Sequence, residues 1–309
     1  MASFTIFLIQ LSDQTILLNI TNNTEYYKIK KEITYHSSIQ NISGYSYGFR
    51  QVSFHVTCDS NASYLVMDTY NGYIVKYDKN WNYITGIPFS NSTAMISIKS
   101  SYDNENFITA NGTIYKLDKD LNILKTFSNQ AIYQILTYNT ASDHILVTAL
   151  AVTQIDIFDR NLTRTGFINF SSPLNYITEC NGLIFVASNS SDVFVLKNET
   201  ISYTFKTACS SVFSLEYYSD KLFLVCSQNI YSYLINGTYT GSVWKNPIPN
   251  LNYIGFDLNG DLVLTSSKGL YILSVPYAPL IQNSLALYSD STCMAKSNLI
   301  MKNLYFKIV

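Results

Sequence analysis

The chain has 309 residues, of which only 13% are charged, and its formal net charge at pH 7 is -1. Soluble domains ordinarily carry about 25% charged residues, and the balance of 20 basic against 21 acidic residues leaves no electrostatic footprint for nucleic acid or an anionic membrane. With 26 Tyr and 17 Phe the chain is too apolar for disorder, and this composition is typical of pleated, half-buried β-surfaces.

Residues 1–48 form an apolar, β-prone N-terminal extension. The stretch "FTIFLIQLS" resembles the start of a signal peptide, but no basic residue precedes it and Asp13 interrupts it. We therefore expect it to belong to the mature fold, or the numbering to begin inside a longer precursor. No stretch reaches the roughly 18 apolar residues that span a bilayer. Residues 25–38, "EYYKIKKEITYHSS", can supply a strand that closes a ring of sheets.

Residues 49–276 repeat at a regular spacing. Each repeat can be aligned on the apolar residue that ends its third strand, and these anchors are Tyr77, Leu117, Phe158, Leu196, Tyr233 and Leu273. The steps between successive anchors are 40, 41, 38, 37 and 40 residues. A period of about 40–50 residues with short alternating strands is typical of a propeller blade.

Within each repeat the same four strands can be read. In the second repeat they are "AMISIKS", "NFITA", "TIYKLD" and "NILKTF", and Asn- and Asp-rich hairpins such as "DKDLN" join the third strand to the fourth. One such sheet cannot bury both faces alone, but sheets stacked radially cover one another. The sequence therefore predicts an all-β, six-bladed β-propeller of four-stranded antiparallel blades, with extra β segments at both termini.

The first repeat resembles the NHL repeat. In that family a strand ends in an Asp-Ser/Thr-x-Asn turn, and the next strand ends in an aromatic-Asp pair before an Asn/Gly-rich hairpin. The residues on this pattern are Asp68, Thr69, Asn71, Tyr77, Asp78 and Asn80. Later repeats keep the aromatic-Asp pair, as at Phe158 and Asp159, or lose it, as at Leu196 and Lys197. The resemblance covers about residues 49–275 and implies the six-bladed fold. Members of the NHL family include RNA binders, lyases and adhesion proteins, so the resemblance implies no single activity.

Eleven Asn-x-Ser/Thr sequons occur along the chain, roughly twice the number that composition alone gives. Their asparagines are Asn19, Asn22, Asn41, Asn61, Asn91, Asn111, Asn161, Asn169, Asn189, Asn198 and Asn236. Most of those in the repeats fall in predicted turns, where a glycan has room. The sequence thus predicts an extracellular, N-glycosylated protein. The alternative is that Asn forms turns and Ser and Thr line β-surfaces without any modification.

Five cysteines are few for a disulfide scaffold in a chain of this length, and an odd number cannot all pair within one molecule. Cys209 precedes the first strand of the fifth blade and Cys226 ends its second, so a hairpin turning at Ser219 and Asp220 brings the two close together. We expect a Cys209–Cys226 disulfide. Cys58 and Cys180 occupy the same position three blades apart, across the central channel, and should not pair with each other.

Groups that could perform catalysis are few. The three histidines, His36, His55 and His144, lie in unrelated units without metal-ligand spacing. Residues 257–262, "DLNGDL", resemble a calcium loop, but Lys268 stands where that loop needs its closing Glu. The recurring acids Asp68, Asp78, Asp118 and Asp159 are expected to form turns. The sequence predicts no catalytic residues, cofactor or metal site.

The surplus apolar ends, residues 1–24 and the C-terminal extension 277–309, leave two hypotheses open. They pair within one molecule, or one end completes a sheet in a neighbouring molecule and produces a head-to-tail filament. The leading hypothesis is a non-enzymatic structural or adhesive subunit that associates with itself or with another extracellular protein or glycan. The alternative is a soluble, lectin-like ligand-binding propeller, in which loop aromatics such as Tyr70, Tyr73 and Trp81 stack on sugars.

Overall fold

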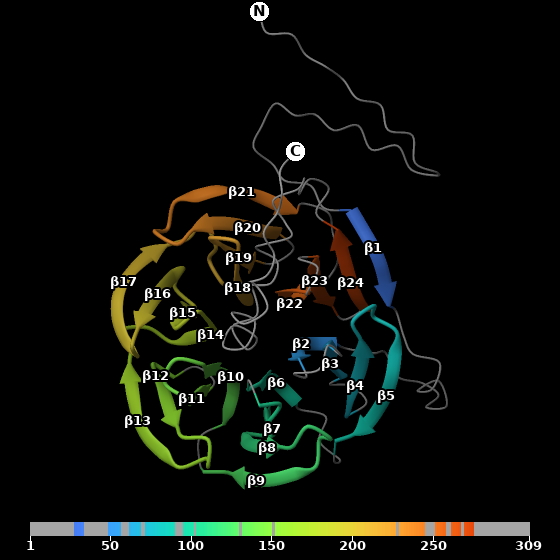
Figure 1. Ribbon diagram of the computed structural model, residues 1–309. Helices are drawn as coiled ribbons and strands as arrows, with labels where there is room; N and C mark the ends of the chain where they lie inside the picture. The colour runs from blue at the N-terminus through green and yellow to red at the C-terminus, as the bar shows by residue number, and fades with distance from the viewer. Residues whose placement is uncertain are drawn as a thin grey trace, which may run out of the picture.

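The computed structural model is an all-β ring of six blades, and each blade is a four-stranded antiparallel sheet (Figure 1). It describes residues 28–33, 49–56, 62–68, 72–89, 95–101, 103–129, 132–149, 152–226, 229–244, 251–257, 261–266 and 269–274. No helix among these residues is long and apolar enough to cross a membrane. The predicted six-bladed β-propeller of four-stranded blades is confirmed over this part of the chain.

Five blades consist of four strands that follow one another along the chain. Blade one contains β2 (Phe49–Val56), β3 (Ala62–Asp68), β4 (Tyr73–Asp78) and β5 (Tyr83–Pro88). Blade two contains β6 (Met95–Ser100), β7 (Asn106–Ala110), β8 (Thr113–Leu117) and β9 (Ile123–Phe127). Blade three contains β10 (Tyr133–Asn139), β11 (His144–Ala149), β12 (Gln154–Phe158) and β13 (Arg164–Asn169). Blade four contains β14 (Leu174–Cys180), β15 (Leu183–Ser188), β16 (Asp192–Lys197) and β17 (Thr200–Lys206). Blade five contains β18 (Ser214–Tyr218), β19 (Lys221–Cys226), β20 (Asn229–Leu234) and β21 (Tyr239–Trp244).

Blade six combines the two ends of the repeat region. Its inner strands are β22 (Leu251–Phe256), β23 (Leu262–Ser266) and β24 (Gly269–Ser274), and its outer strand is β1 (Lys28–Ile33). The pairing of β1 with β24 is antiparallel and runs from Lys28 opposite Ser274 to Ile33 opposite Leu270. The strand lies inside the segment 25–38 that the sequence favours for ring closure. Residues 1–27, 34–48 and 275–309, which include the predicted terminal β segments, lie outside the described residues.

The anchors of the repeat fall in phase with the blades. Each lies at or next to the end of the third strand of its blade, and the five whose burial is described are at most 2% exposed: Tyr77, Leu117, Phe158, Leu196 and Tyr233. The sixth, Leu273, is the last residue but one of β24. The five anchors with described burial recur because each packs in an apolar cluster that joins blades.

The core lies between neighbouring blades, where the second and third strands are buried on both faces. In blade four, β15 and β16 are almost wholly buried, whereas β17 is exposed along nearly its whole length. Apolar clusters join successive blades; one combines Phe107 of blade two with Leu136 and Ile145 of blade three. Burying one such side chain contributes about 1.5–3 kcal/mol, so stability rests on contacts between blades.

A recurring hairpin joins the third strand to the fourth in blades one to three. Asp78 Oδ1 accepts the backbone N–H groups of Asn80 and Asn82, each at 2.8 Å, and Asp118 and Asp159 hold their turns with the same spacing. These acids form turns, as the sequence predicts. The residue three positions after each Asp has a positive φ and is buried, and these residues are Trp81, Leu121 and Leu162.

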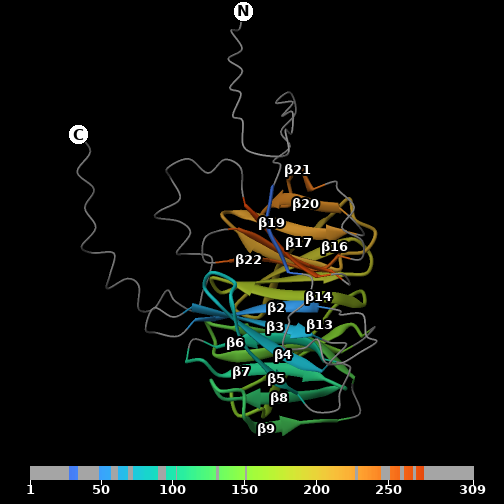
Figure 2. The ribbon, with the colours of Figure 1, turned by 90° about the vertical axis from the view of Figure 1, so that its right-hand side faces the viewer.

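The ring has two faces, seen edge-on in Figure 2. Because the strands alternate in direction, turns between first and second strands and between third and fourth strands lie on one face. We call this the hairpin face. Turns between second and third strands, and the connections between blades, lie on the opposite face, which we call the connection face.

Candidate functional site

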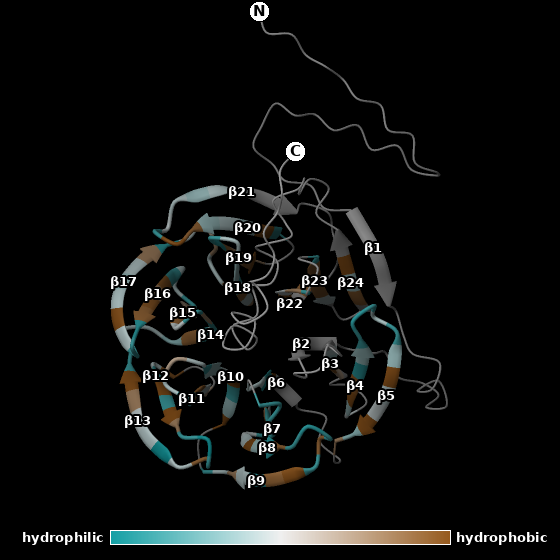
Figure 3. Cartoon of the chain, viewed as in Figure 1, coloured by the Kyte–Doolittle hydropathy of each residue, from teal (hydrophilic) through white to brown (hydrophobic). Residues whose placement is uncertain are grey.

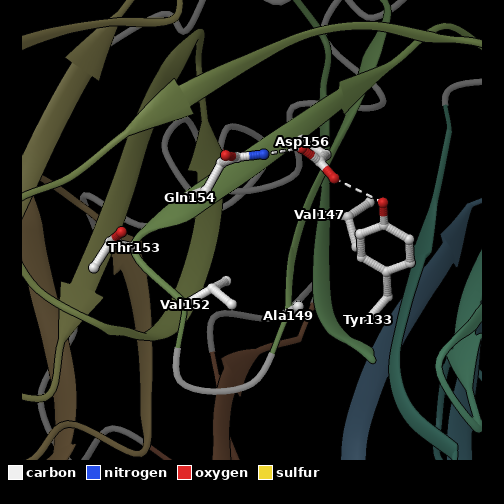
Figure 4. Close-up of a pocket in the computed structure, with 7 residues that line it drawn as sticks. All are labelled: Tyr133, Val147, Ala149, Val152, Thr153, Gln154 and Asp156. Atoms are coloured by element: carbon white, nitrogen blue, oxygen red, sulfur yellow. Dashed lines mark hydrogen bonds between the residues drawn. The ribbon is translucent and has the colours of Figure 1, made fainter. Parts of the chain in front are cut away.

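A cavity of about 210 Å³ opens on the connection face of blade three (Figure 4). It lies where β10 and β12 begin and where β11 ends, so the turn between β11 and β12 forms part of its wall. Apolar side chains and polar side chains share the lining: Val147, Ala149 and Val152 against Tyr133, Thr153, Gln154 and Asp156. Its polar side chains converge at one end of the hollow.

Asp156 lies at the polar end of the cavity and is only 8% exposed. Tyr133 donates its hydroxyl proton to Asp156 Oδ2 at 2.7 Å, Gln154 donates to Oδ1 at 2.5 Å, and Arg164 donates to Oδ1 at 2.6 Å. Burial raises the pKa of Tyr133, and the hydrogen bond to Asp156 raises it further. The phenol therefore stays protonated at physiological pH and keeps donating to the carboxylate.

The Asp156 carboxylate has little hydrogen-bonding capacity left for a ligand. A carboxylate offers about four acceptor positions, and three donors already engage Asp156. The lining places one hydroxyl beside a carboxylate, since Tyr133 donates to Asp156 at 2.7 Å. The apolar wall and the hydroxyl and amide groups of Thr153 and Gln154 suit a small ligand that carries both apolar surface and hydroxyl groups.

A second polar contact crosses the central channel. Lys99 Nζ on β6 lies 3.8 Å from Glu216 Oε2 on β18, and the side chains are 18% and 14% exposed. Blades two and five lie on opposite sides of the axis, as Figure 1 shows. Thr178 of blade four donates its hydroxyl to the same Glu216 oxygen at 3.3 Å.

Lys99 and Glu216 occupy equivalent positions in their blades. Each lies two residues after a serine, Ser97 or Ser214, whose hydroxyl accepts a hydrogen bond from the next blade. Ser97 accepts the backbone N–H of Leu136 at 3.1 Å, and Ser214 accepts the backbone N–H of Ile254 at 3.2 Å. Opposite charges thus meet from opposite sides of the ring. The sequence reasoning missed this pair, although aligning the repeats on Ser97 and Ser214 would have placed the two charges at the same position.

A third polar group connects blades three and four on the hairpin face. Glu199 Oε1 accepts hydrogen bonds from Asn139 at 3.0 Å, from Ser142 and from His144 Nδ1 at 2.8 Å. Burial acts to raise the pKa of Glu199, but the hydrogen bonds from Ser142 and His144 lower it more, so the net shift is downward. His144 is thereby a partnered strand residue, as expected; the side chains of His36 and His55 lie outside those described.

All six sequon asparagines within the described residues are exposed: Asn111, Asn161, Asn169, Asn189, Asn198 and Asn236. By contrast, only five of the ten other asparagines with described burial are exposed, and Asn106 and Asn139 are buried. The remaining predicted sequons lie outside the described residues: Asn19, Asn22, Asn41, Asn61 and Asn91. None of the described sequon asparagines is thus buried as an internal hydrogen-bonding group.

A disulfide joins Cys209 and Cys226, whose Cα atoms are 5.7 Å apart. It ties the connection between blades four and five to the end of β19, which is the pairing predicted from the hairpin geometry. Cys180 is 3% exposed at the end of β14. Cys58 and Cys293 lie outside the described residues.

The described residues of the calcium-like stretch, Asp257, Asp261 and Leu262, lie where β22 ends and β23 begins. Asp257 Oδ1 accepts the backbone N–H of Asp261 at 2.9 Å, and Asp257 Oδ2 accepts the indole N–H of Trp81 at 3.2 Å. Among the described residues, no three His, Cys, Asp or Glu side chains gather as metal ligands. Trp81, considered from sequence as a sugar platform, is 4% exposed and stacks on Tyr64 with the ring centroids 4.0 Å apart.

No protein-family model matches the chain, and no curated protein matches it in sequence. Its fold, in contrast, resembles many solved structures. One is the Pan2 WD40 domain of Neurospora crassa, with a TM-score of 0.57 and 10% sequence identity, covering 87% of this chain and 99% of that one. At this identity the likeness shows the β-propeller fold alone.

Proposed function

We propose that the protein is a non-enzymatic, extracellular, N-glycosylated β-propeller that serves as a structural or adhesive subunit. The observation that carries the proposal is the uniform exposure of the sequons. Every described sequon asparagine is exposed, while half of the other described asparagines are not. A transferase needs access to the side-chain amide, so exposure is the physical condition for modification.

The sequons are distributed over both faces of the ring. Asn161, Asn198 and Asn236 lie in third-to-fourth hairpins on the hairpin face, whereas Asn111 and Asn189 lie in second-to-third turns on the connection face. At Asn236 the side-chain oxygen accepts the backbone N–H of Thr238 at 3.0 Å, which leaves the amide nitrogen directed away from that turn contact. Glycans at these positions would cover both faces and confine protein contacts to the perimeter.

The disulfide supports the extracellular part of the proposal. Disulfides persist in oxidising compartments and are rare where thiols are kept reduced. The Cys209–Cys226 bond closes a loop across the connection between two blades, and such a loop typically stabilises a domain by about 2–4 kcal/mol. The likeness of the first repeat to NHL repeats remains part of this proposal, since adhesion proteins occur in that family.

The polar groups of the described core support a non-enzymatic role. Asp78, Asp118 and Asp159 hold turns, and Asp156 is engaged by three donors. These carboxylates serve the architecture of the blades. A rigid ring of stacked blades is suited to present its perimeter to partner proteins, because stacked repeat folds generally provide extended binding surfaces.

Mass spectrometry of glycopeptides from native material tests the proposal. We expect glycans on Asn161, Asn198 and Asn236, and an intact mass above the 35.0 kDa of the bare chain. Asn161→Gln should remove one glycan, whereas Asn122→Gln, at an exposed asparagine outside any sequon, should remove none. Native protein with bare asparagines at all six described sequons would overturn the extracellular glycoprotein.

The cavity of blade three favours a second candidate, the lectin-like propeller. Its apolar wall and the groups of Thr153 and Gln154 match a small polyhydroxy ligand (Figure 4). Titration with monosaccharides, followed by NMR line shifts, tests this function. A response that Gln154→Ala abolishes would support it, whereas no response to any sugar at millimolar concentration would reject it.

A further inference from the structure

The outermost strand of each blade presents an unpaired edge within the described sheets. In the strand order of every blade, β5, β9, β13, β17, β21 and β1 stand at the end. An exposed edge offers a row of backbone donors and acceptors to any other strand, so proteins usually protect such edges. The protection differs from blade to blade.

Four outer strands have a sequon within three residues of one end. Asn91 follows β5, Asn161 precedes β13 and Asn169 ends it, Asn198 precedes β17, and Asn236 precedes β21. The outer strand β1 instead contains three lysines in its sequence "KIKKEI", and lysine is a common means of protecting an edge. The outer strand β9 has no sequon within three residues of either end and a single lysine, Lys125, although Asn122 and Asn129 stand beside it outside any sequon.

Strand β9 also has the most exposed pair of apolar neighbours among the outer-strand side chains that the structure describes. Ile123 is 52% exposed and Leu124 is 55% exposed, and Figure 3 shows β9 as one of the hydrophobic outer strands. Every residue of β9 except the last is exposed. An apolar, solvent-facing edge of this kind is the surface to which an added strand binds.

The charge of this edge restricts the partner. Lys125 lies directly opposite Lys116 in the pairing of β9 with β8, and like charges in that arrangement repel each other. Lys116 is neutralised by Glu105 at 2.8 Å. Lys125 makes no ion pair with a described residue, so an acidic residue on an added strand would supply the missing countercharge.

One segment of the chain itself has this character. Residues 1–24 are apolar and β-prone, and Asp13 is their only charged side chain. The C-terminal residues 275–309 have one acid, Asp290, against the three lysines Lys296, Lys302 and Lys307. The stretch around Asp290 would also bring a carboxylate, but it follows β24, an inner strand of blade six, whereas residues 1–24 lead directly into β1, which is an outer strand as β9 is.

We propose that residues 4–20 of one copy add as a strand to the free edge of β9 in a second copy, with Asp13 beside Lys125. The inference rests on the proposed function, because glycans are what protect the competing edges. Donor and acceptor are different surfaces, so the contact is head-to-tail, and one copy can bind a second through its N-terminal strand and a third through β9. Residues 21–27 precede β1 and can extend about 25 Å, which allows the donor to leave its own blade.

Analytical ultracentrifugation of the glycosylated full-length protein tests the acceptor. We expect Leu124→Glu to raise the concentration of half-assembly at least tenfold, which corresponds to about 1.4 kcal/mol. The matched control is Ile84→Glu on β5, because Ile84 is 49% exposed on an outer strand that a sequon follows. We expect Ile84→Glu to leave assembly within twofold of the unmodified chain.

A charge exchange tests the pairing itself. Asp13→Lys and Lys125→Glu should each weaken assembly, and the double variant should recover it to within about threefold of the original, since it restores opposite charges. Equal losses for Leu124→Glu and Ile84→Glu, no recovery in the double variant, a monomeric parent protein, or a native N-terminus beyond residue 20 would each overturn the inference.

The same samples separate this inference from the proposed function. Glycopeptide analysis reports on modification alone, whereas the difference between Leu124→Glu and Ile84→Glu reports on the docking edge alone. Enzymatic removal of the glycans should expose the other outer edges. We then expect assembly to become less sensitive to Leu124→Glu, and unchanged sensitivity would contradict the protective role of the glycans.

Discussion

Trp81 and Gly237 occupy equivalent places in the third-to-fourth hairpins of blades one and five, and they satisfy the same backbone requirement differently. Both have positive φ, 61° for Trp81 and 86° for Gly237. The side chain of Trp81 is buried in the core, whereas a Cβ on Gly237 would lie 2.5 Å from Phe205 Cβ of blade four. In blade one the residue at this position carries a buried indole, whereas in blade five the residue must have no side chain.

Replacing Trp81 by Phe should lower the free energy of unfolding by about 1.5–3 kcal/mol, because an aromatic ring remains over Tyr64 but the hydrogen bond to the Asp257 carboxylate is lost. Urea denaturation measures the change. A double-mutant cycle with Asp257→Asn isolates the contact. Additive effects of the two substitutions would show that the indole and the carboxylate do not interact.

Gly237→Ala should destabilise the protein by about 1–3 kcal/mol through overpacking against Phe205 and through strain at positive φ. The substitution preserves the sequon of Asn236. Gly166→Ala is the matched control, because the nearest atom to its added Cβ is Ile157 Cδ1 at 3.7 Å. Thermal unfolding should separate the two variants, and similar midpoints would contradict this reading of the hairpin.

At the scale of whole elements, the blades depend on contacts with their neighbours. The turn between β16 and β17 shows how a turn fixes a neighbouring blade, since Asn198 and Glu199 both have positive φ and Glu199 reaches the β10–β11 turn of blade three. A non-glycine residue at positive φ costs free energy. The hydrogen bonds to Glu199 offset that cost and orient blade four against blade three.

The downward shift in the pKa of Glu199 makes this contact sensitive to acid. Its contribution is present above the ordinary glutamate value of 4.5 and is lost as the pH falls through the lowered pKa of the folded state. Glu199→Gln should therefore cost about 1–3 kcal/mol at pH 7 and progressively less below pH 4.5. Unfolding measured across pH tests this.

The control for Glu199→Gln is Asp120→Asn, at an exposed carboxylate in another hairpin of the same type. It should change the unfolding free energy by less than about 0.5 kcal/mol at every pH. A cost for Glu199→Gln that stays constant down to pH 3 would show that its hydrogen bonds do not depend on the charge.

Strand β1 is the element on which ring closure depends. Deleting residues 1–33 should remove its pairing with β24, expose the edge of blade six and lower the unfolding free energy by several kcal/mol, at about 0.5–1.5 kcal/mol per hydrogen bond. Deleting residues 1–27 is the control and leaves the strand in place. Equal denaturation midpoints for the two truncations would contradict closure by β1.

At the scale of the whole molecule, the Lys99–Glu216 pair connects opposite sides of the ring. Lys99→Met should cost about 1–3 kcal/mol, because it removes the positive charge that faces the poorly exposed Glu216 carboxylate. The double variant Lys99→Met with Glu216→Gln should recover most of that loss. A double variant as unstable as Lys99→Met alone would show that packing, and not charge, is responsible.

The sequence predicted the features that recur in every blade and those formed by residues close together in the chain. The anchors from Tyr77 to Leu273 gave the blades, the segment 25–38 contained the closing strand, and the hairpin at Ser219 and Asp220 brought Cys209 to Cys226. Each of these follows from periodicity or from one hairpin. The sequence reasoning also expected turn roles for the recurring aspartates, which Asp78, Asp118 and Asp159 fulfil.

The features that the sequence did not predict depend on contacts between blades or on contacts within the blade-three cavity. Lys99 meets Glu216, and His144 meets Glu199, from blades whose relative placement only the ring determines. In the cavity, Tyr133 and Asp156 lie on strands that do not pair directly, so the hydrogen bond between them is invisible in strand alternation. Polar contacts between sheets leave little trace in a single sequence.

Completing blade six with β1 also sets the order of events during synthesis. Ile33 leaves the ribosome long before its partner strand, whose last residue, Ser274, is added 241 positions later. At translation rates of about 5–20 residues per second, that interval lasts roughly 10 to 50 seconds. During that time five blades can form and stack, while the first strand waits without its partner. The nascent chain therefore stays an open arc until its final repeat emerges.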